Sequence, residues 1–252
     1  MTDASTAGEA GESIEIRSGT ELPARREEIE LHTSDGLTLV GELALPLHRE
    51  PVATLVTLHP LPTAGGFMDS HVLRKASLRL PAQADLAVLR FNTRGTSSPR
   101  GTSDGEFGDG ETERADLEAA MAFVRERSLP NPWLVGWSFG TELALKHGHE
   151  HADVKGLILL SPPLRRTSQA ELDRWADARI PVVMVVPEHD DFLKPDEAAQ
   201  RIAHLPNLEL VPVDDGRHLW VGEKQTKRVL TEIVQHTNPA ALPLSSSWPS
   251  GE

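Results

Sequence analysis

The sequence predicts a single α/β domain in which helices cover both faces of a mostly parallel central sheet. Short runs of aliphatic and β-branched residues alternate along the chain with longer segments of helical periodicity. The length of 252 residues fits one large α/β domain. Hydrophobic residues make up 38% of the chain, which is enough for a core, and they form no run long enough to span a membrane.

The two ends are expected to lie outside this domain. Residues 1–22 are rich in small and polar residues without periodicity, which indicates a disordered segment. Residues 238–252 contain three prolines and a run of three serines, which predicts a flexible tail, although Trp248 could anchor it. The folded domain is therefore expected to span residues 23–237.

The sheet is predicted to start with an antiparallel hairpin. Residues 28–32 and 37–45 read as strands around the turn sequence Ser34-Asp35-Gly36. The following strands are largely apolar runs, as expected for strands buried on both faces. They cover residues 54–58, 86–91, 133–135, 157–160 and 181–186, and residues 208–213 are predicted as the final strand.

Helices are predicted between several of these strands. Residues 113–126 show the i, i+3, i+4, i+7 spacing of one buried face, and further helical segments cover residues 141–147, 196–203 and 224–235. In an open sheet of this kind, ligands bind beyond the carboxyl ends of the strands. Candidate functional residues are therefore sought directly after the strands.

Charge and composition exclude several classes of function. The formal net charge of −13 disfavours nucleic acid and anionic membranes, and the pairs Arg25-Arg26 and Arg165-Arg166 are interpreted as solvated surface. The absence of cysteine excludes thiol nucleophiles and thiolate metal ligands. Because the first residues also lack the pattern of a secretory signal, we expect a cytoplasmic protein.

The segment Gly136-Trp137-Ser138-Phe139-Gly140 matches the G-x-S-x-G pattern of a nucleophile elbow. It lies between a predicted strand and a predicted helix. A serine in such a turn needs a strained backbone, and glycines two residues before and after it avoid a steric collision. The helix that follows directs free N–H groups toward an oxyanion. An ordinary glycine-rich turn is the alternative, and we predict that Ser138 is a nucleophile.

A serine nucleophile needs an imidazole base and an acid that orients the imidazole. In the elbow arrangement the acid and then the histidine follow the serine along the chain. His218 lies just beyond the predicted strand 208–213, in a glycine-containing turn. Asp190 and Asp191 both follow the predicted strand 181–186, so spacing alone leaves the choice between them open.

The core from residue 28 to residue 235 resembles the α/β-hydrolase superfamily. The segments Leu58-His-Pro-Leu-Pro-Thr-Ala-Gly-Gly-Phe-Met68 and Leu89-Arg-Phe-Asn-Thr-Arg-Gly95 resemble small bacterial serine hydrolases related to the dienelactone hydrolases, which are usually described as esterases. The chain departs from that family at Leu61, where a second histidine is common, and at Pro187, where a glycine often precedes the acid. The resemblance implies an α/β-hydrolase fold with a short cap segment and no cofactor.

The resemblance also implies roles for individual residues. The acid of the family lies three residues after the position of Pro187, which selects Asp190 over Asp191. Glu188 and His189 are then expected to shape the loop.

The oxyanion hole is expected to combine the Phe139 N–H with an N–H from the loop after residue 58. Since Pro60 and Pro62 have no N–H, both chain chemistry and the family position favour Leu61, and the alternative is a merely rigid loop. By the family pattern, His59 braces this loop.

Two clusters could imitate metal sites. The histidines 147, 149 and 151 are interpreted as helix-end and solvent-facing residues, and the acidic residues 104, 109, 111 and 113 as a solvated loop and helix start, because they lack EF-hand spacing. No metal is expected.

The leading hypothesis is hydrolysis of a small carboxylic ester through an acyl-enzyme on Ser138. A thioesterase, peptidase or acyltransferase with the same triad, or a non-catalytic binding protein, is the alternative, and the oligomeric state is open. Residues 161–179 leave room for only one short capped helix at 167–175. Because Leu172 and Trp175 are its main apolar side chains, we expect a preference for short acyl groups.

Overall fold

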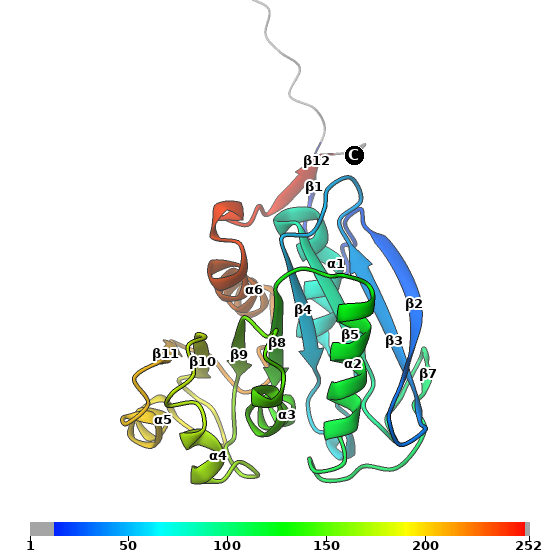
Figure 1. Cartoon of the computed structure of the whole chain (residues 1–252). Helices are drawn as coiled ribbons and strands as arrows, with labels where there is room; N and C mark the ends of the chain where they lie inside the picture. Colours follow the sequence, from blue (N-terminus) through cyan, green and yellow to red (C-terminus); the bar gives the residue numbers. More distant parts are fainter. Residues whose placement is uncertain (1–12, 250–252) are drawn as a thin grey trace, which may run out of the picture.

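An eight-stranded sheet forms the centre of the computed structural model, which describes residues 13–249 (Figure 1). The strand order is β11-β10-β9-β8-β4-β5-β3-β2, and every pair is parallel except β2–β3 and β3–β5. The strands are β2 (Arg25–His32), β3 (Thr38–Leu45), β4 (Ala53–Leu58), β5 (Leu86–Phe91), β8 (Pro132–Trp137), β9 (Gly156–Leu160), β10 (Val182–Pro187) and β11 (Leu208–Val213).

Helices cover both faces of this sheet. They are α1 (His71–Ala84), α2 (Arg114–Glu126), α3 (Phe139–His147), α4 (Gln169–Asp173), α5 (Pro195–Ile202) and α6 (Glu223–Thr237). The helices α2 to α5 contribute to one hydrophobic cluster, and α1 and α6 contribute to a second cluster on the opposite face. Side chains of the central strands alternate between the two clusters, as in β8, where Leu134 joins the first cluster and Val135 the second.

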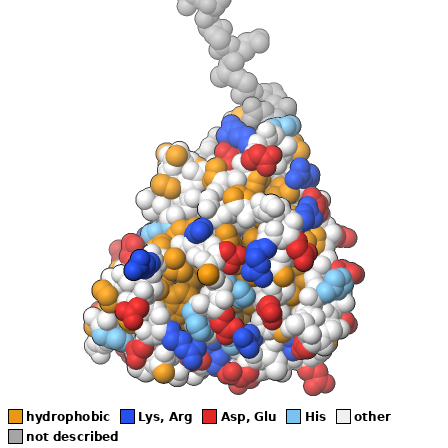
Figure 2. Space-filling view, in the orientation of Figure 1, with side chains coloured by type: hydrophobic (Ala, Val, Ile, Leu, Met, Phe, Trp, Pro, Cys, Tyr) orange, Lys and Arg blue, Asp and Glu red, His pale blue; other side chains and the backbone are white. Residues whose placement is uncertain are grey.

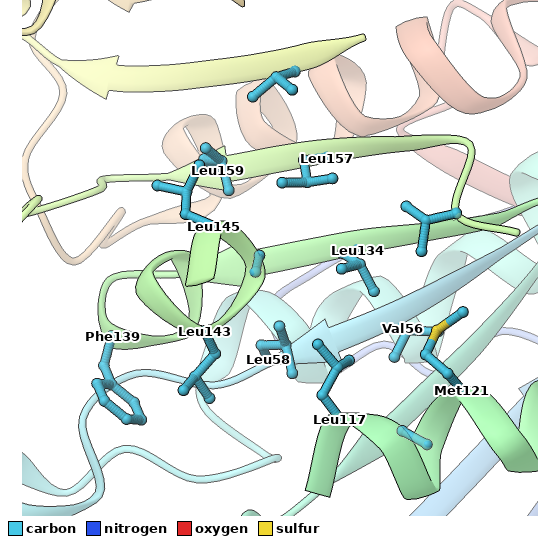
Figure 3. Packing of buried hydrophobic residues seen from close by; sticks show 14 of the residues in the cluster. Val56, Leu58, Leu117, Met121, Leu134, Phe139, Leu143, Leu145, Leu157 and Leu159 are labelled. Carbon is cyan, nitrogen blue, oxygen red and sulfur yellow. The ribbon is translucent and has the colours of Figure 1, made fainter. Parts of the chain in front are cut away.

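The helix α3 packs closely on the middle of the sheet. Figure 3 shows Leu143 of α3 near Leu58 of β4 and Leu117 of α2. All three side chains are at most 1% exposed. The helix that begins at the candidate nucleophile is therefore held by the core on the sheet side and by α2 beside it.

The predicted strands and helices all occur, with ends shifted by at most three residues. The helix α1 was not predicted. Its pattern is obscured because Pro81 lies inside it and because Lys75 and Arg79 are buried rather than solvated. Both cations pair with Glu223 at the start of α6, so the polar side of α1 is covered by another helix and the sequence shows no clean amphipathic stripe.

The described parts of the two ends differ from the expected disorder and flexibility. The short strands β1 (Ser13–Glu15) and β12 (Ser247–Pro249) pair with each other, and Leu22 and Leu244 are buried at 1% and 5% exposure. A few scattered apolar residues from both ends find partners across the chain, which local composition does not reveal. The predictions for residues 1–12 and 250–252 lie outside the described residues.

The short cap segment has the predicted helix, but its apolar side chains do not face a substrate site. Ser168 caps α4, and its side chain and that of Glu171 form a reciprocal capping box. Leu172 and Trp175 are 0% and 3% exposed and belong to the core, and Trp175 Nε1 donates to the Leu145 carbonyl. The expected role of these two residues as substrate contacts is therefore wrong, because they anchor the segment to α3.

Two further minor elements follow β5: the strands β6 (Ser97–Ser98) and β7 (Gly101–Thr102) form a small hairpin.

Figure 2 shows acidic and basic side chains interspersed on the viewed face, with no continuous basic stripe there. Among residues 13–249, no helix combines the length and the apolar composition needed to cross a bilayer.

Candidate active site

Ser138 follows β8 directly, at the carboxyl end of a central strand. Its backbone has φ 52° and ψ −116°, a strained conformation for a residue with a side chain. A Cβ on Gly136 would lie 2.5 Å from the Gly140 carbonyl oxygen, and a Cβ on Gly140 would lie 2.0 Å from the Leu58 carbonyl oxygen. Both glycines are therefore required for the sharp turn that presents the serine hydroxyl.

The structure brings Ser138, His218 and Asp190 into one hydrogen-bonded line. His218 Nε2 lies 2.9 Å from Ser138 Oγ, and His218 Nδ1 lies 2.9 Å from Asp190 Oδ2. The histidine and the aspartate are buried, at 6% and 3% exposure. A carboxylate at Nδ1 fixes the imidazole tautomer that leaves the Nε2 lone pair to accept the serine proton.

The second oxygen of the Asp190 carboxylate is also occupied. Asp190 Oδ1 accepts hydrogen bonds from the backbone N–H groups of Phe192 and Leu193, at 2.8 and 3.3 Å. These bonds hold the carboxylate plane in a fixed orientation toward His218. The neighbouring Asp191 is exposed, and no hydrogen bond or ion pair joins it to His218 within the described residues.

Three side chains that the sequence analysis did not single out hold the loop of His218. Trp137 Nε1 and Ser161 Oγ both donate to the His218 carbonyl oxygen, at 3.1 and 3.2 Å. His71 Nε2 lies 2.6 Å from the Leu219 carbonyl oxygen, and the His71 ring packs edge-on against Trp137. The sequence contained a signal for Ser161, because this residue directly follows the carboxyl end of β9, where functional residues were sought.

The loops that carry the acid and the base are joined to each other. The His189 N–H donates to the Gly216 carbonyl oxygen at 2.9 Å, and the Asp215 N–H donates to Glu188 Oε2 at 2.9 Å. Glu188 and His189 thus shape the loop in the way the resemblance implied. These two bonds link the loop of the acid to the loop of the base.

His59 braces the segment after β4. The residue is 1% exposed, its Nδ1 lies 2.7 Å from the Pro60 carbonyl oxygen, and its Nε2 accepts from the Thr93 N–H at 3.1 Å. Burial lowers the pKa of His59 to about 4, although the bond to Pro60 opposes that shift. At neutral pH the ring is therefore uncharged, with its proton on Nδ1.

Within the described residues, the two backbone amides expected in the oxyanion hole are free to donate. The N–H groups of Leu61 and Phe139 have no acceptor among residues 13–249. The Leu61 loop closes on itself, because the Gly66 N–H donates to the Leu61 carbonyl oxygen at 2.9 Å. A Cβ on Gly66 would lie 2.9 Å from the Leu61 nitrogen and 2.1 Å from the Pro60 carbonyl oxygen, so only glycine permits this loop.

The clusters considered as metal sites have structural partners. The expectation that His147 faces solvent is wrong, because the residue is buried and its Nε2 lies 2.7 Å from the Gly110 carbonyl oxygen. The buried Glu113 carboxylate accepts from the N–H groups of Gly108 and Gly110, so it closes its loop instead of facing solvent. Within residues 13–249, two other groups place ligand atoms within 4.8 Å of one another: Glu188 with His189 and Asp215, and Glu209 with Glu232 and His236.

Comparisons with known proteins identify the family of this fold. A family model described as an alpha/beta hydrolase domain matches residues 53–243. The chain belongs to the alpha/beta hydrolase family. No curated protein sequence matches the hydrolase. The predicted superfamily and fold class are confirmed, and membership of this family supports enzymatic hydrolysis.

Several solved structures resemble the hydrolase. A serine hydrolase from Xanthomonas campestris, described as having no lid, is 26% identical with a TM-score of 0.71, and the match covers 90% of this chain and 100% of that one. A serine hydrolase homologue from Coxiella burnetii is 22% identical with a TM-score of 0.71, covering 83% and 96%. An esterase from Pyrococcus furiosus is 19% identical with a TM-score of 0.66, covering 84% and 92%.

Proposed function

We propose that the hydrolase cleaves small carboxylic esters through a covalent acyl-enzyme on Ser138. The observation that carries this proposal is the continuous line from Asp190 through His218 to Ser138 Oγ, with both links at 2.9 Å. The similarity to an esterase from Pyrococcus furiosus supports the ester class of substrate. We place the activity in the cytoplasm because the chain has no cysteine and therefore no need of an oxidising compartment.

In the first half-reaction, Ser138 Oγ bonds to the carbonyl carbon of the ester while His218 Nε2 takes the serine proton. The carbonyl oxygen becomes an oxyanion that accepts hydrogen bonds from the N–H groups of Phe139 and Leu61. The carbon–oxygen bond of the alcohol then breaks, and His218 returns the proton to the departing oxygen. Asp190 stays ionised and stabilises the imidazolium.

In the second half-reaction, His218 removes a proton from water, and the water oxygen attacks the acyl carbon. The same two amides stabilise the second oxyanion, and the bond to Ser138 Oγ breaks as His218 protonates the serine. Ester and water are thereby converted to acid and alcohol with no cofactor in the balance.

A fluorophosphonate probe tests the proposal directly. We expect the probe to modify Ser138 in the folded wild-type protein, with the site located by peptide mass spectrometry, and not to modify Ser138→Ala. A parallel screen of 4-nitrophenyl esters, thioesters and anilides with one acyl group should show the highest kcat/KM for the ester. Folded protein that neither reacts with the probe nor turns over any acyl donor would point to a ligand-binding protein instead.

A further inference from the structure

A pocket of about 490 Å³ is lined in part by Phe192 and Leu193, which belong to the loop that carries Asp190. Its lining includes Leu164, Arg165, Phe192, Leu193, Glu197 and Arg201. The Phe192 ring packs edge-on against the His218 ring, with 4.5 Å between the ring centroids. One wall of the pocket is therefore in direct contact with the residue that we propose as the base.

Arg165 presents a positive charge in this pocket. Its guanidinium lies over the Phe192 ring, 4.6 Å from the centroid, and it forms no ion pair within residues 13–249. The adjacent Arg166 differs, since its Nε lies 2.6 Å from Asp109 Oδ1. A guanidinium stacked on an aromatic face keeps the N–H donors at its edge free.

A second guanidinium adds to the charge of the pocket. Arg201 Nη1 donates to the Leu164 carbonyl oxygen at 2.9 Å, and Arg201 forms no ion pair within the described residues. Glu197 is the acidic residue in the lining. The chain has 38 acidic against 25 basic residues, so two arginines without a carboxylate partner in one pocket contrast with its overall charge.

The backbone of Arg165 is fixed relative to the nucleophile. The carboxylate of Glu142 is fully buried in the first turn of α3 and accepts from the N–H groups of Arg165 and Arg166, at 2.8 and 3.0 Å. The helix α3 begins directly after Ser138. Because the backbone of Arg165 is anchored to the helix that begins after Ser138, only its exposed side chain has to become ordered when it binds a ligand.

We propose that the ester substrate carries a carboxylate group a few atoms from the bond that is cleaved, and that Arg165 binds this carboxylate in the pocket. This inference rests on the proposed function, because it names the substrate class of the same site. The planar guanidinium matches a carboxylate through two parallel hydrogen bonds, and Arg201 adds attraction for the anion. Glu197 opposes the anion and limits its affinity.

Two pairs of esters that differ only in charge test the inference. The first pair is the 4-nitrophenyl monoester of succinate and that of succinamate, with the anion in the acyl part. The second pair is 4-carboxyphenyl and 4-carbamoylphenyl butyrate, with the anion in the alcohol part. At low ionic strength we expect about tenfold higher kcat/KM for the anionic member of one pair, which corresponds to one charge-assisted bond.

Variants assign this preference to the pocket. Arg165→Gln should abolish the preference while changing kcat/KM for the neutral ester less than threefold, Arg165→Lys should keep part of it, and Glu197→Gln should increase it. Arg179→Gln is the matched control, because this exposed arginine precedes β10 and so lies at the opposite edge of the sheet. Added salt should weaken the preference.

Binding without turnover separates this inference from the proposed function. Calorimetry with Ser138→Ala should show tighter binding of monomethyl succinate than of methyl succinamate, and the further change Arg165→Gln should remove the difference. Turnover of neutral esters without any preference that depends on Arg165 would overturn the carboxylate site and leave the esterase standing. Charge-selective binding without turnover of any ester would do the reverse, and the absence of both would overturn both.

Discussion

Two polar regions of the molecule differ in the groups at which their hydrogen bonds end. The first is the active-site line of Asp190, His218 and Ser138, and the second is a buried cluster of ion pairs. The second cluster comprises Glu42, Asp69, Arg90 and Arg100, with the Glu42 and Arg90 side chains at most 3% exposed. Arg90 bonds to both carboxylates, and Arg100 Nη2 lies 2.8 Å from Glu42 Oε2. Burial alone would raise the pKa of Glu42, but Arg90 and the other donors hold it below its usual value.

The cluster around Arg90 is closed, because its charges neutralise one another. The active-site line is open, because it ends at Ser138 Oγ, a partly exposed hydroxyl on a strained backbone. Burial and charge are thus common to both regions. The difference is that the active-site line ends at a partly exposed hydroxyl, so we expect changes in this line to affect turnover and changes in the cluster around Arg90 to affect stability.

The largest effect on turnover is expected when the serine or the histidine of the active-site line is replaced. Ser138→Ala and His218→Ala should each lower kcat for a 4-nitrophenyl ester by about 10⁵-fold or more, and the double variant should be scarcely worse, because the residues act as a unit. The free energy of unfolding in urea should stay within about 1 kcal/mol of wild type. Near-wild-type turnover by Ser138→Ala would show that the nucleophile is elsewhere.

The next largest effect concerns the acid. Asp190→Asn should lower kcat by about a thousandfold or more, because an amide at this position no longer fixes the imidazole tautomer. Asp191→Asn is the matched control and should change kcat only a few-fold, since Asp191 is exposed and the carboxylate that bonds to His218 is that of Asp190. The opposite ranking in folded proteins would move the acid by one residue.

A substitution in the cluster around Arg90 should lower stability and leave turnover nearly unchanged. Arg90→Met leaves two carboxylates without their buried partner and should lower the free energy of unfolding by about 3–5 kcal/mol, while kcat of the folded enzyme changes little. Arg49→Met breaks an exposed pair with Asp85 and should cost about 1 kcal/mol or less. A variant of Arg90 that kept its stability but lost turnover would contradict the distinction between the two regions.

Low pH should weaken the hydrogen bonds by which His59 holds the loop of Leu61. Since the folded-state pKa of His59 is about 4 and the ordinary value is 6.5, the unfolded state binds more protons between these values. The stabilisation is complete above about pH 6.5 and is lost as the pH falls toward 4, a loss of about 3 kcal/mol. Urea unfolding of His59→Gln should show a shallower pH dependence over this range, and parallel curves would disprove the buried neutral histidine.

The smallest effect concerns the length of the acyl group. Each enclosed methylene would gain about 0.8 kcal/mol, but Leu172 and Trp175 are part of the core and the remaining apolar residues near the site, such as Phe192 and Leu219, are largely exposed. We expect kcat/KM to change only a few-fold from acetate to octanoate esters of one alcohol, below any micelle threshold. A steady rise through octanoate to palmitate would reveal an enclosed apolar channel.

The site residues that could best be predicted from the sequence are those whose chemistry requires a particular local structure. The elbow around Ser138 could be recognised because a strand, two obligatory glycines and a helix must follow one another within a few residues. The positions of Asp190 and His218 could be narrowed to two loops because both follow apolar strands. Spacing did not choose between Asp190 and Asp191, and only the resemblance to a family did so.

The sequence by itself determined the parallel sheet, the place of the nucleophile and the loops of its partners, because these depend on periodicity and backbone sterics over short distances. Only the tertiary structure decided the burial of Lys75 and Arg79 in α1, the pairing of the two chain ends and the position of Arg165 over Phe192. Each of these depends on contacts between residues far apart in the chain. Whether a charged or aromatic side chain is covered or left free is settled by the neighbour that reaches it, and local composition carries no record of that neighbour.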